Sequence, residues 1–369
     1  MRAFEFLAEA ETKKLGRDLN HLEDLVFFYG SKGANQAVDN LESYTKDTSG
    51  VAIKWDGQMA LFWGRDEHGN FMLLPKNNWG RTEGQVKSAE ELAAFFTSRG
   101  NNEPWRAQLA SDLSGMWPIF EAATPKRFRG FLFGDLLYHP GKNKEDLADQ
   151  IKFTPNKTTY IVNKNSAIGK RVAETTIGIT VHGMYKHFGD APESMLPVKA
   201  MDQFNSPSIL VMGPVYMDKH RPKVNNKELS AIREYVMKHS AEMDVFLAPK
   251  EGLGDLKQII YKYVNTMSKA RRLDEIERGF WDWLKGADSK VSAPKQARIG
   301  ELSRQMPTAL PAILHLVRLL MTAKDHVINQ LDTANGDVTA YTAGERGGEG
   351  YVVRAHDVKL VPRHRWQPN

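Results

Sequence analysis

Lys54 is the residue whose type and position point most directly to chemistry. It ends the short apolar run 51–53 and is followed by Trp55, Asp56 and Gly57. A lysine amine attacks a phosphorus or carbonyl centre only when desolvation and nearby cations remove its proton, as a strand end inside a pocket allows. The carboxylate can orient that amine or a metal-bound water, and the glycine permits a tight turn. The same pattern also fits a strand-to-turn junction with a solvated lysine.

Later segments carry further charged side chains in or beside predicted strands. They are PKNNWGR with Lys76 and Arg81, FLFGDLLY with Asp135, TTIGITVHGMY with His182, and EGYVVRAHDVKLV with Glu349 and Lys359. In this order, the set resembles the motifs of ATP-dependent DNA ligases, RNA ligases and mRNA capping enzymes. The resemblance covers residues 50–185 and 345–365.

Within that resemblance, the Lys54 segment is similar to the motif whose lysine forms a phosphoramidate with a nucleoside monophosphate. Either Lys76 or Arg81 matches the basic residue that follows. Asp135 stands where the third motif more often has glutamate. The strand with His182 is similar to the one that packs on the nucleobase, although a core or edge histidine fits this position equally well.

The last two motifs come from the C-terminal segment. Glu349 resembles the glutamate that serves the divalent metal, and Lys359 resembles the lysine that contacts the α-phosphate. A second lysine often follows two residues later in the family; Val361 occupies that position, and Arg363 is the nearest replacement. The segment 151–172 is also similar to a phage-encoded subgroup.

The resemblance implies a covalent nucleotidyltransferase that uses ATP and Mg²⁺, with Mn²⁺ as a substitute, and joins nicked or broken DNA or RNA ends. The implied catalytic residues are Lys54, Asp56, Glu349 and Lys359. The implied nucleotide-binding residues are Ile53, Lys54, Trp55, Gly57, Lys76, Arg81, Asp135, His182 and Lys359. The implied metal ligands are Asp135 and Glu349, because Mg²⁺ prefers oxygen donors.

Both helices and strands must position these residues. Apolar spacing predicts helices before residue 46 and through most of 225–332, and strands between 50 and 185 and after 350. We expect an α/β nucleotidyltransferase fold of antiparallel sheets with helices, without a C-terminal OB-fold. The predicted domains are a helical cap (1–48), the catalytic domain (49–224 and 336–369) and an inserted helical domain (225–335).

Composition limits the class of protein. Hydrophobic residues make up 41% and charged residues 26% of the 369 residues, which is typical of a globular chain. The absence of cysteine excludes disulfides and thiolate metal sites. The N-terminus has no signal-peptide pattern, so we expect a cytoplasmic protein, in the host cytoplasm if phage-encoded, without a membrane partner. The net charge of +5 favours an anionic partner.

The inserted helical domain is a candidate clamp for the polynucleotide, since it is too long for a passive loop. Its basic residues include Lys257, Lys262, Lys269, Arg271, Arg272, Lys290, Lys295 and Arg298, diluted by Asp274, Glu275 and Glu277. Helical spacing around Trp281 and Trp283 favours packing over base stacking, and Gly30 to Gly33 favours a turn over a phosphate loop.

Two other functions fit the same residues. One is a capping-type guanylyltransferase that prefers GTP, and the other is a catalytically silent nucleic-acid-binding protein of the same fold. The sequence leaves open DNA or RNA on each side of the break, as well as the oligomeric state.

Overall fold

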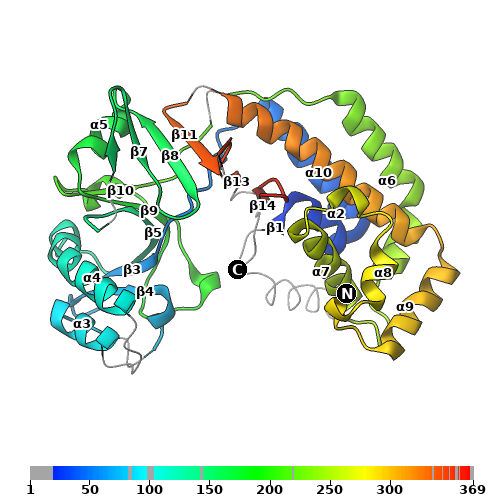
Figure 1. Cartoon of the computed structure of the whole chain (residues 1–369), viewed down its shortest axis with the longest axis horizontal. Helices are drawn as coiled ribbons and strands as arrows, with labels where there is room; N and C mark the ends of the chain where they lie inside the picture. The colour runs from blue at the N-terminus through cyan, green and yellow to red at the C-terminus, as the bar shows by residue number, and fades with distance from the viewer. Residues whose placement is uncertain are drawn as a thin grey trace. The chain divides into compact units, whose positions relative to one another are not determined.

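The computed structural model describes residues 20–81, 85–97, 104–141, 144–217, 220–334, 336–342, 344–348, 350–353, 356 and 358–365. The fold is mixed α/β and divides into two compact units (Figure 1). Unit 1 contains the described parts of Met1–Lys54, Tyr216–Ala334 and Glu349–Asn369, and unit 2 those of Trp55–Val215 and Asn335–Gly348. The N-terminal helix and the predicted insertion therefore share one unit with the strand before Lys54. The three predicted domains stay predictions, because the units group residues by contact and not by role.

Unit 1 is mainly helical. Its helices are η1 (Leu22–Asp24), α2 (Leu25–Lys46), α6 (Asn226–Leu247), α7 (Leu256–Lys269), η6 (Leu273–Glu275), α8 (Phe280–Lys285), η7 (Ala287–Ser289), α9 (Ala293–Gln305) and α10 (Ala309–Thr333). Asn225 caps α6, because its side chain accepts hydrogen bonds from the backbone of Lys227 and Glu228. The helices expected over 225–332 are interrupted after α7, which ends at Lys269, and Arg271 takes a left-handed φ of 56°.

A small mixed sheet completes unit 1, in the order β1 (Asn20–His21), β14 (Val358–Leu360), β13 (Tyr351–Val353) and β2 (Val51–Ile53). One face of this sheet supplies Val51, Tyr351, Val353, Val358 and Leu360 to the core that the helices share. Helix α10 contributes the largest set of buried side chains to that core. The strand that leads to Lys54 is thus anchored by helices from a distant part of the sequence.

A buried ion cluster fixes the chain after β14. Lys324 on α10 lies 2.8 and 2.9 Å from the two carboxylate oxygens of Glu23, and the Nε of Arg363 donates to the same carboxylate at 2.9 Å. Arg363 also contacts Asp24, and all four side chains are at most 1% exposed. Charges this deep are tolerated only when paired and hydrogen-bonded, so the cluster ties the C-terminal segment to η1 and α10.

Unit 2 contains two five-stranded sheets. The first runs β10 (Ile209–Met212), β9 (Ile177–Tyr185), β5 (Gly130–Tyr138), β3 (Ala60–Arg65) and β4 (Phe71–Pro75); the second runs β12 (Glu345–Arg346), β11 (Val338–Thr342), β8 (Thr158–Asn163), β7 (Gln150–Phe153) and β6 (Glu145–Asp146). Helices α3 (Ala89–Thr97) and α4 (Pro104–Ala123) accompany the first sheet and α5 (Ala167–Glu174) the second (Figure 1). The short helices η2 (Lys76–Asn78), η4 (Pro192–Ser194) and η5 (Met201–Phe204) lie in connections.

The expected strands of unit 2 are confirmed, including the β3–β4 hairpin. Asp66 closes its turn by accepting hydrogen bonds from the backbone of His68 and Asn70 at 3.0 and 2.8 Å. The sheets are mostly antiparallel, as expected, but β9 and β10 pair in parallel, as do β1 and β14 in unit 1. The architecture is therefore mixed α/β with mixed sheets.

Among the described residues, no single helix is long and apolar enough to cross a membrane. Helices α9 and α10, which meet at 90°, pass that test of length and composition only as a bent pair.

Candidate functional site

The sheet of unit 1 places Lys54 and Lys359 on one face. The backbone N–H of Lys54 donates to the carbonyl of Gly350 at 2.9 Å, so the ladder of β2 and β13 extends to Lys54. Ala52 pairs with Val352, and Val352 pairs with Lys359. Because alternate residues of a strand share a face, Lys54, Ala52, Val352 and Lys359 all lie opposite the core.

The two lysines are two strands apart, which separates their backbones by about 10 Å across the sheet. Lys359 is only 7% exposed, and Lys54 is half-buried. In the register of β1 and β14, Lys359 also lies beside the buried His21. The side chain of Ile53 instead packs against the core on the opposite face.

Glu349 lies outside the described residues. Its neighbour Gly350 has a φ of 101°, and a Cβ there would stand 2.2 Å from the carbonyl oxygen of Leu360. Only glycine fits so close to β14, which explains its place beside the expected acid.

The second cluster lies in unit 2, where Asp135 on β5 meets His182 on β9. The Nε2 of His182 lies 3.0 Å from Oδ2 of Asp135, and each side chain is about a quarter exposed. The pairing of β5 with β9 shifts register here: Phe133 pairs with Gly183, but Gly134 pairs with Val181. His182 is the extra residue of this bulge, and bulges commonly redirect a side chain in this way.

An aromatic wall continues from this pair along the same face of the sheet. Phe133 contacts the ring of His182 edge-on at 5.4 Å and stacks on Phe62 at 4.6 Å, and Phe62 in turn stacks on Trp79 at 3.9 Å. The ammonium of Lys76 lies 5.7 Å from the centre of the Phe133 ring. Of the two expected basic residues, Lys76 is thus beside the Asp135 cluster; Arg81 is exposed after η2.

The loop after Lys54 reaches Asp135 through its glycine. A Cβ on Gly57 would stand 2.3 Å from the Cβ of Asp135, and the backbone N–H of Gln58 donates to Leu136 at 2.9 Å. The backbone N–H of Asp56 donates to the hydroxyl of Tyr160 at 2.6 Å. These contacts fix the loop within unit 2 and explain the glycine.

Two further side chains hold this loop, and sequence reasoning gave them no role. Asn156 donates from Nδ2 to the carboxylate of Asp56 at 3.1 Å, and the ring of Tyr160 packs at a tilt against that of Trp55, with 4.6 Å between the ring centres. Trp55 is only 5% exposed, so its indole is mainly a packing group. Both residues belong to the segment 151–172, which the sequence analysis singled out without giving either residue a role.

Two sequence interpretations are corrected. Arg363 cannot serve as a second cation at the phosphates, because its guanidinium is 1% exposed and bound to Glu23 and Asp24. Gly30 marks a kink inside α2 and not a turn, with a φ of 60°. The carboxylate of Asp244 accepts hydrogen bonds there from the N–H and hydroxyl of Ser31, at 2.7 and 2.6 Å. An anion already occupies this position, which leaves no phosphate site.

The candidate residues therefore form two separate clusters, one in each unit; Lys54 is the last residue of its segment of unit 1, and Trp55 is the first of unit 2. The cluster of unit 1 holds two cations on a sheet face. The cluster of unit 2 holds an acid, an imidazole, a cation and several aromatic rings. Within the described part of the chain, no group of three or more His, Asp or Glu side chains forms a ready metal cage.

The structure is that of a mixed α/β protein with a lysine at the end of a strand. The chain belongs to the family of unknown function DUF6267, whose model matches residues 17–367. No curated protein and no solved structure matches the chain.

Proposed function

We propose that the chain is an ATP-dependent polynucleotide ligase of the covalent nucleotidyltransferase type, with a ligase-type fold. The observation that carries the proposal is the shared sheet face of Lys54 and Lys359, next to the glycine that follows Glu349. The order of the motifs supports it independently. The shared sheet face and the order of the motifs together favour a ligase.

In the first step, the neutral Nζ of Lys54 attacks the α-phosphorus of ATP. A P–N bond forms, the bond from that phosphorus to the bridging oxygen breaks, and pyrophosphate leaves; the amine proton passes to solvent. Lys359 offsets the charge that develops on the phosphoryl oxygens, and catalysis rests on positioning and charge stabilisation.

In the second step, an oxygen of the 5′-phosphate attacks the same phosphorus, and the P–N bond to Lys54 breaks. The 3′-hydroxyl then attacks the activated 5′-phosphate and releases AMP. Each step exchanges one bond to phosphorus for another, so no oxidant or reductant is needed.

Unit 2 by itself offers groups of the types that a nucleotide needs. In this proposal, Phe133 offers its ring to adenine, and Lys76 beside it is a cation for the phosphates. Asp56, fixed by Tyr160 and Asn156, orients the loop that carries the nucleophile. Asp135 and His182 hold each other in one geometry beside Gly57.

Asp135 fits a Mg²⁺ ligand in chemical type, since its carboxylate is partly exposed and offers oxygen donors. Asp135 would hold an ion that offsets phosphate charge when bound, and Glu349 stays the second expected ligand from sequence alone. The imidazole of His182 must then share or yield its carboxylate oxygen.

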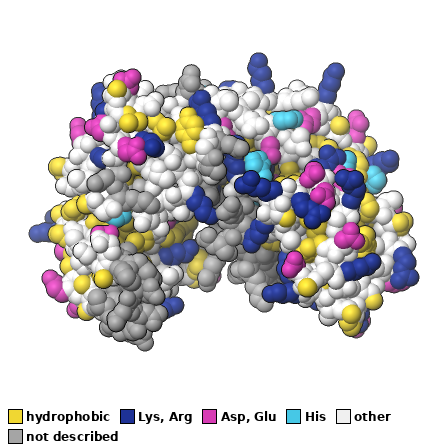
Figure 2. Space-filling view, viewed as in Figure 1, with side chains coloured by type: hydrophobic (Ala, Val, Ile, Leu, Met, Phe, Trp, Pro, Cys, Tyr) yellow, Lys and Arg dark blue, Asp and Glu magenta, His cyan; other side chains and the backbone are white. Residues whose placement is uncertain are grey.

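Nucleic acid is the proposed partner, and the helical part of unit 1 is the proposed surface. Figure 2 shows Lys and Arg side chains on this unit, interspersed with acidic ones. Three of the predicted cations are held internally: Lys257 by Phe28, Lys262 by Ser289, and Lys295 by Asp255. The exposed cations that remain include Lys269, Arg271, Lys290 and Arg298.

The test is intact-mass spectrometry after incubation with Mg²⁺ and either ATP or GTP. The proposal expects the mass of one AMP from ATP, stable to denaturation and absent in Lys54→Ala. An adduct from GTP alone would indicate a capping-type enzyme. An adduct from neither, with nucleic-acid binding intact, would indicate the silent binding protein.

A further inference from the structure

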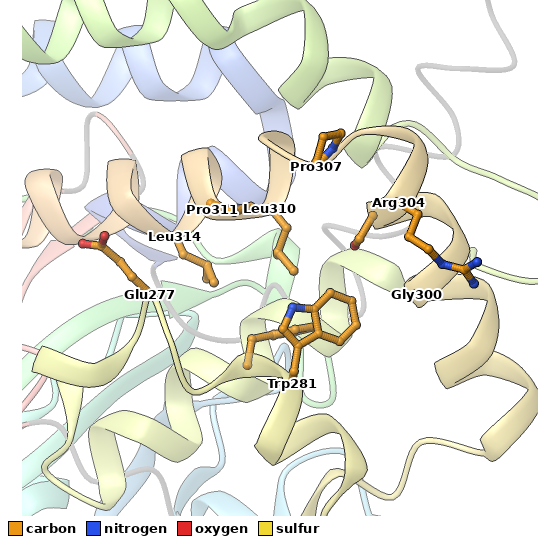
Figure 3. Close-up of a pocket in the computed structure, with 10 residues that line it drawn as sticks. Glu277, Trp281, Gly300, Arg304, Pro307, Leu310, Pro311 and Leu314 are labelled. Atoms are coloured by element: carbon orange, nitrogen blue, oxygen red, sulfur yellow. The ribbon is translucent and has the colours of Figure 1, made fainter.

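A pocket of about 490 Å³ opens between α8, α9 and α10 of unit 1, separate from both clusters of the candidate site. The volume lies within the roughly 300–1,000 Å³ of small-molecule sites. Leu310, Pro311 and Leu314 of α10 form one wall, and Figure 3 shows the indole of Trp281 below them. A flat apolar ring fits against such a lining.

Trp281 is exposed but rigidly mounted. The indole is 37% exposed, although large aromatic side chains are usually more buried. It contacts Phe280 edge-on at 5.3 Å, and Phe280 in turn contacts Tyr263, whose hydroxyl donates to the carbonyl of Ile276 at 2.8 Å. A stacking surface held in this way loses little side-chain entropy when a ring binds.

The two ends of the pocket carry different charged side chains. Figure 3 shows Glu277 and Arg304 on opposite sides of Trp281. Burial favours the neutral acid, but hydrogen bonds from Arg318 and His315 outweigh it and lower the pKa of Glu277. Glu277 is thus ionised, and its charge is offset by Arg318 and His315, which leaves no free cation for a phosphate at this end of the described pocket.

The opposite end suits a phosphate. Arg304 pairs with Glu301 at 3.0 Å, and both side chains are more than half exposed, so this pair is weak and Arg304 can turn to another anion. The hydroxyl of Ser303, which also lines the pocket, is buried and has no hydrogen-bond partner among the described residues. A polar edge of a bound ring would relieve this unmet hydrogen bond.

We infer that this pocket takes one unpaired nucleobase of a single-stranded stretch of nucleic acid, stacked on Trp281 with its backbone phosphate at Arg304. The ligand class rests on the proposed function, since a ligase handles polynucleotide ends. The inference assigns to unit 1 a base-binding site in addition to the charged surface. It also revises the expectation that Trp281 serves packing alone.

The experiment compares two labelled oligonucleotides by fluorescence anisotropy: a single strand with bases and an abasic strand of equal length. Trp281→Ala should weaken binding of the first by about 5- to 100-fold, the usual effect of losing one stacking contact, and leave the abasic strand unchanged. Trp281→Phe should retain most of the affinity. An equal loss on both strands, or no loss on either, would overturn the inference.

A second variant guards against misfolding. A Cβ on Gly300, which lines the pocket, would meet no atom within 4 Å, so Gly300→Leu fills the space and improves helix propensity. It should reproduce the selective loss. Gly115→Leu on α4 is the matched control, because Gly115 also faces open space, and it should change nothing.

The outcomes separate the inference from the proposed function. Selective loss with Gly300→Leu but no Lys54 adduct would retain the base site and reject the ligase. A normal adduct with unchanged binding by Gly300→Leu would reject the base site alone.

Discussion

The hydroxyl of Tyr160 accepts a hydrogen bond from the backbone N–H of Asp56 at 2.6 Å, across 104 residues of sequence. Tyr160 is fully buried on β8, and its ring packs at a tilt against that of Trp55. One strand of the second sheet of unit 2 thus holds the loop that follows Lys54. In the proposed function, this contact sets the orientation of the nucleophile.

Tyr160→Phe should slow adduct formation several-fold, because Asp56 loses a backbone partner while the ring still packs. We expect the free energy of unfolding to fall by about 0.5–1.5 kcal/mol, the usual contribution of one hydrogen bond. Rapid-quench measurement of the adduct, with ATP varied, should show the change in the rate and not in the apparent affinity. Tyr216→Phe, at a hydroxyl-bearing ring that is 50% exposed, is the control. An unchanged rate would show that the contact is only structural.

Lys54→Arg should abolish the adduct completely, because a guanidinium keeps the charge but is not a nucleophile.

Lys359→Ala should still form the adduct, about 10²–10³-fold more slowly, as expected when one group that stabilises transition-state charge is lost. Intact mass and single-turnover rates measure both. Lys170→Ala, an exposed lysine on α5, is the control. A normal rate for Lys359→Ala would remove this residue from the proposed site.

The sequence predicts local elements well where the signal lies within a few residues. The strand that carries Asp135 and the helices that follow residue 225 were predicted from the spacing of apolar residues alone. The features that were not predicted depend on contacts between residues that are far apart in the sequence. The ion pairs of Arg363 with Glu23, the kink at Gly30 held by Asp244, and the bulge at His182 arise from segments that meet only in the folded chain.

Asp325→Asn should stabilise the protein at pH 8. Burial raises the pKa of Asp325 to about 6, with opposing effects from Lys324, Arg365 and His326 and a further increase from Glu23. Because this exceeds the value of about 4 in the unfolded chain, the free energy of unfolding falls as the pH rises from about 4 to about 6. Asp325→Asn has no carboxyl group to ionise at this position, so its free energy of unfolding does not fall for this reason.

Denaturant titrations should therefore show a gain of up to about 3 kcal/mol at pH 8 that vanishes below about pH 4, as expected for a shift of about two pKa units. Asp288→Asn, at an exposed acid, is the control and should show no such trend. A gain that does not vary with pH would exclude ionisation of Asp325 as the cause.

The charged surface of unit 1 should bind polynucleotides without regard to their bases. Replacing the helices by a linker cannot test this, because Val51 and Tyr351, on the strands that hold Lys54, share their core with α10. Charge reversal leaves that core intact. Lys269→Glu with Arg271→Glu changes two exposed cations after α7 and should weaken base-containing and abasic strands equally, unlike Trp281→Ala. Each lost phosphate contact should also reduce the slope of log affinity against log salt by about one.

The matched control is the adjacent exposed pair Lys126→Glu with Arg127→Glu in unit 2, which should leave the affinity for both strands and the salt slope unchanged. Equal effects of the two double variants would mean that net charge alone, and not a surface on unit 1, attracts the strand.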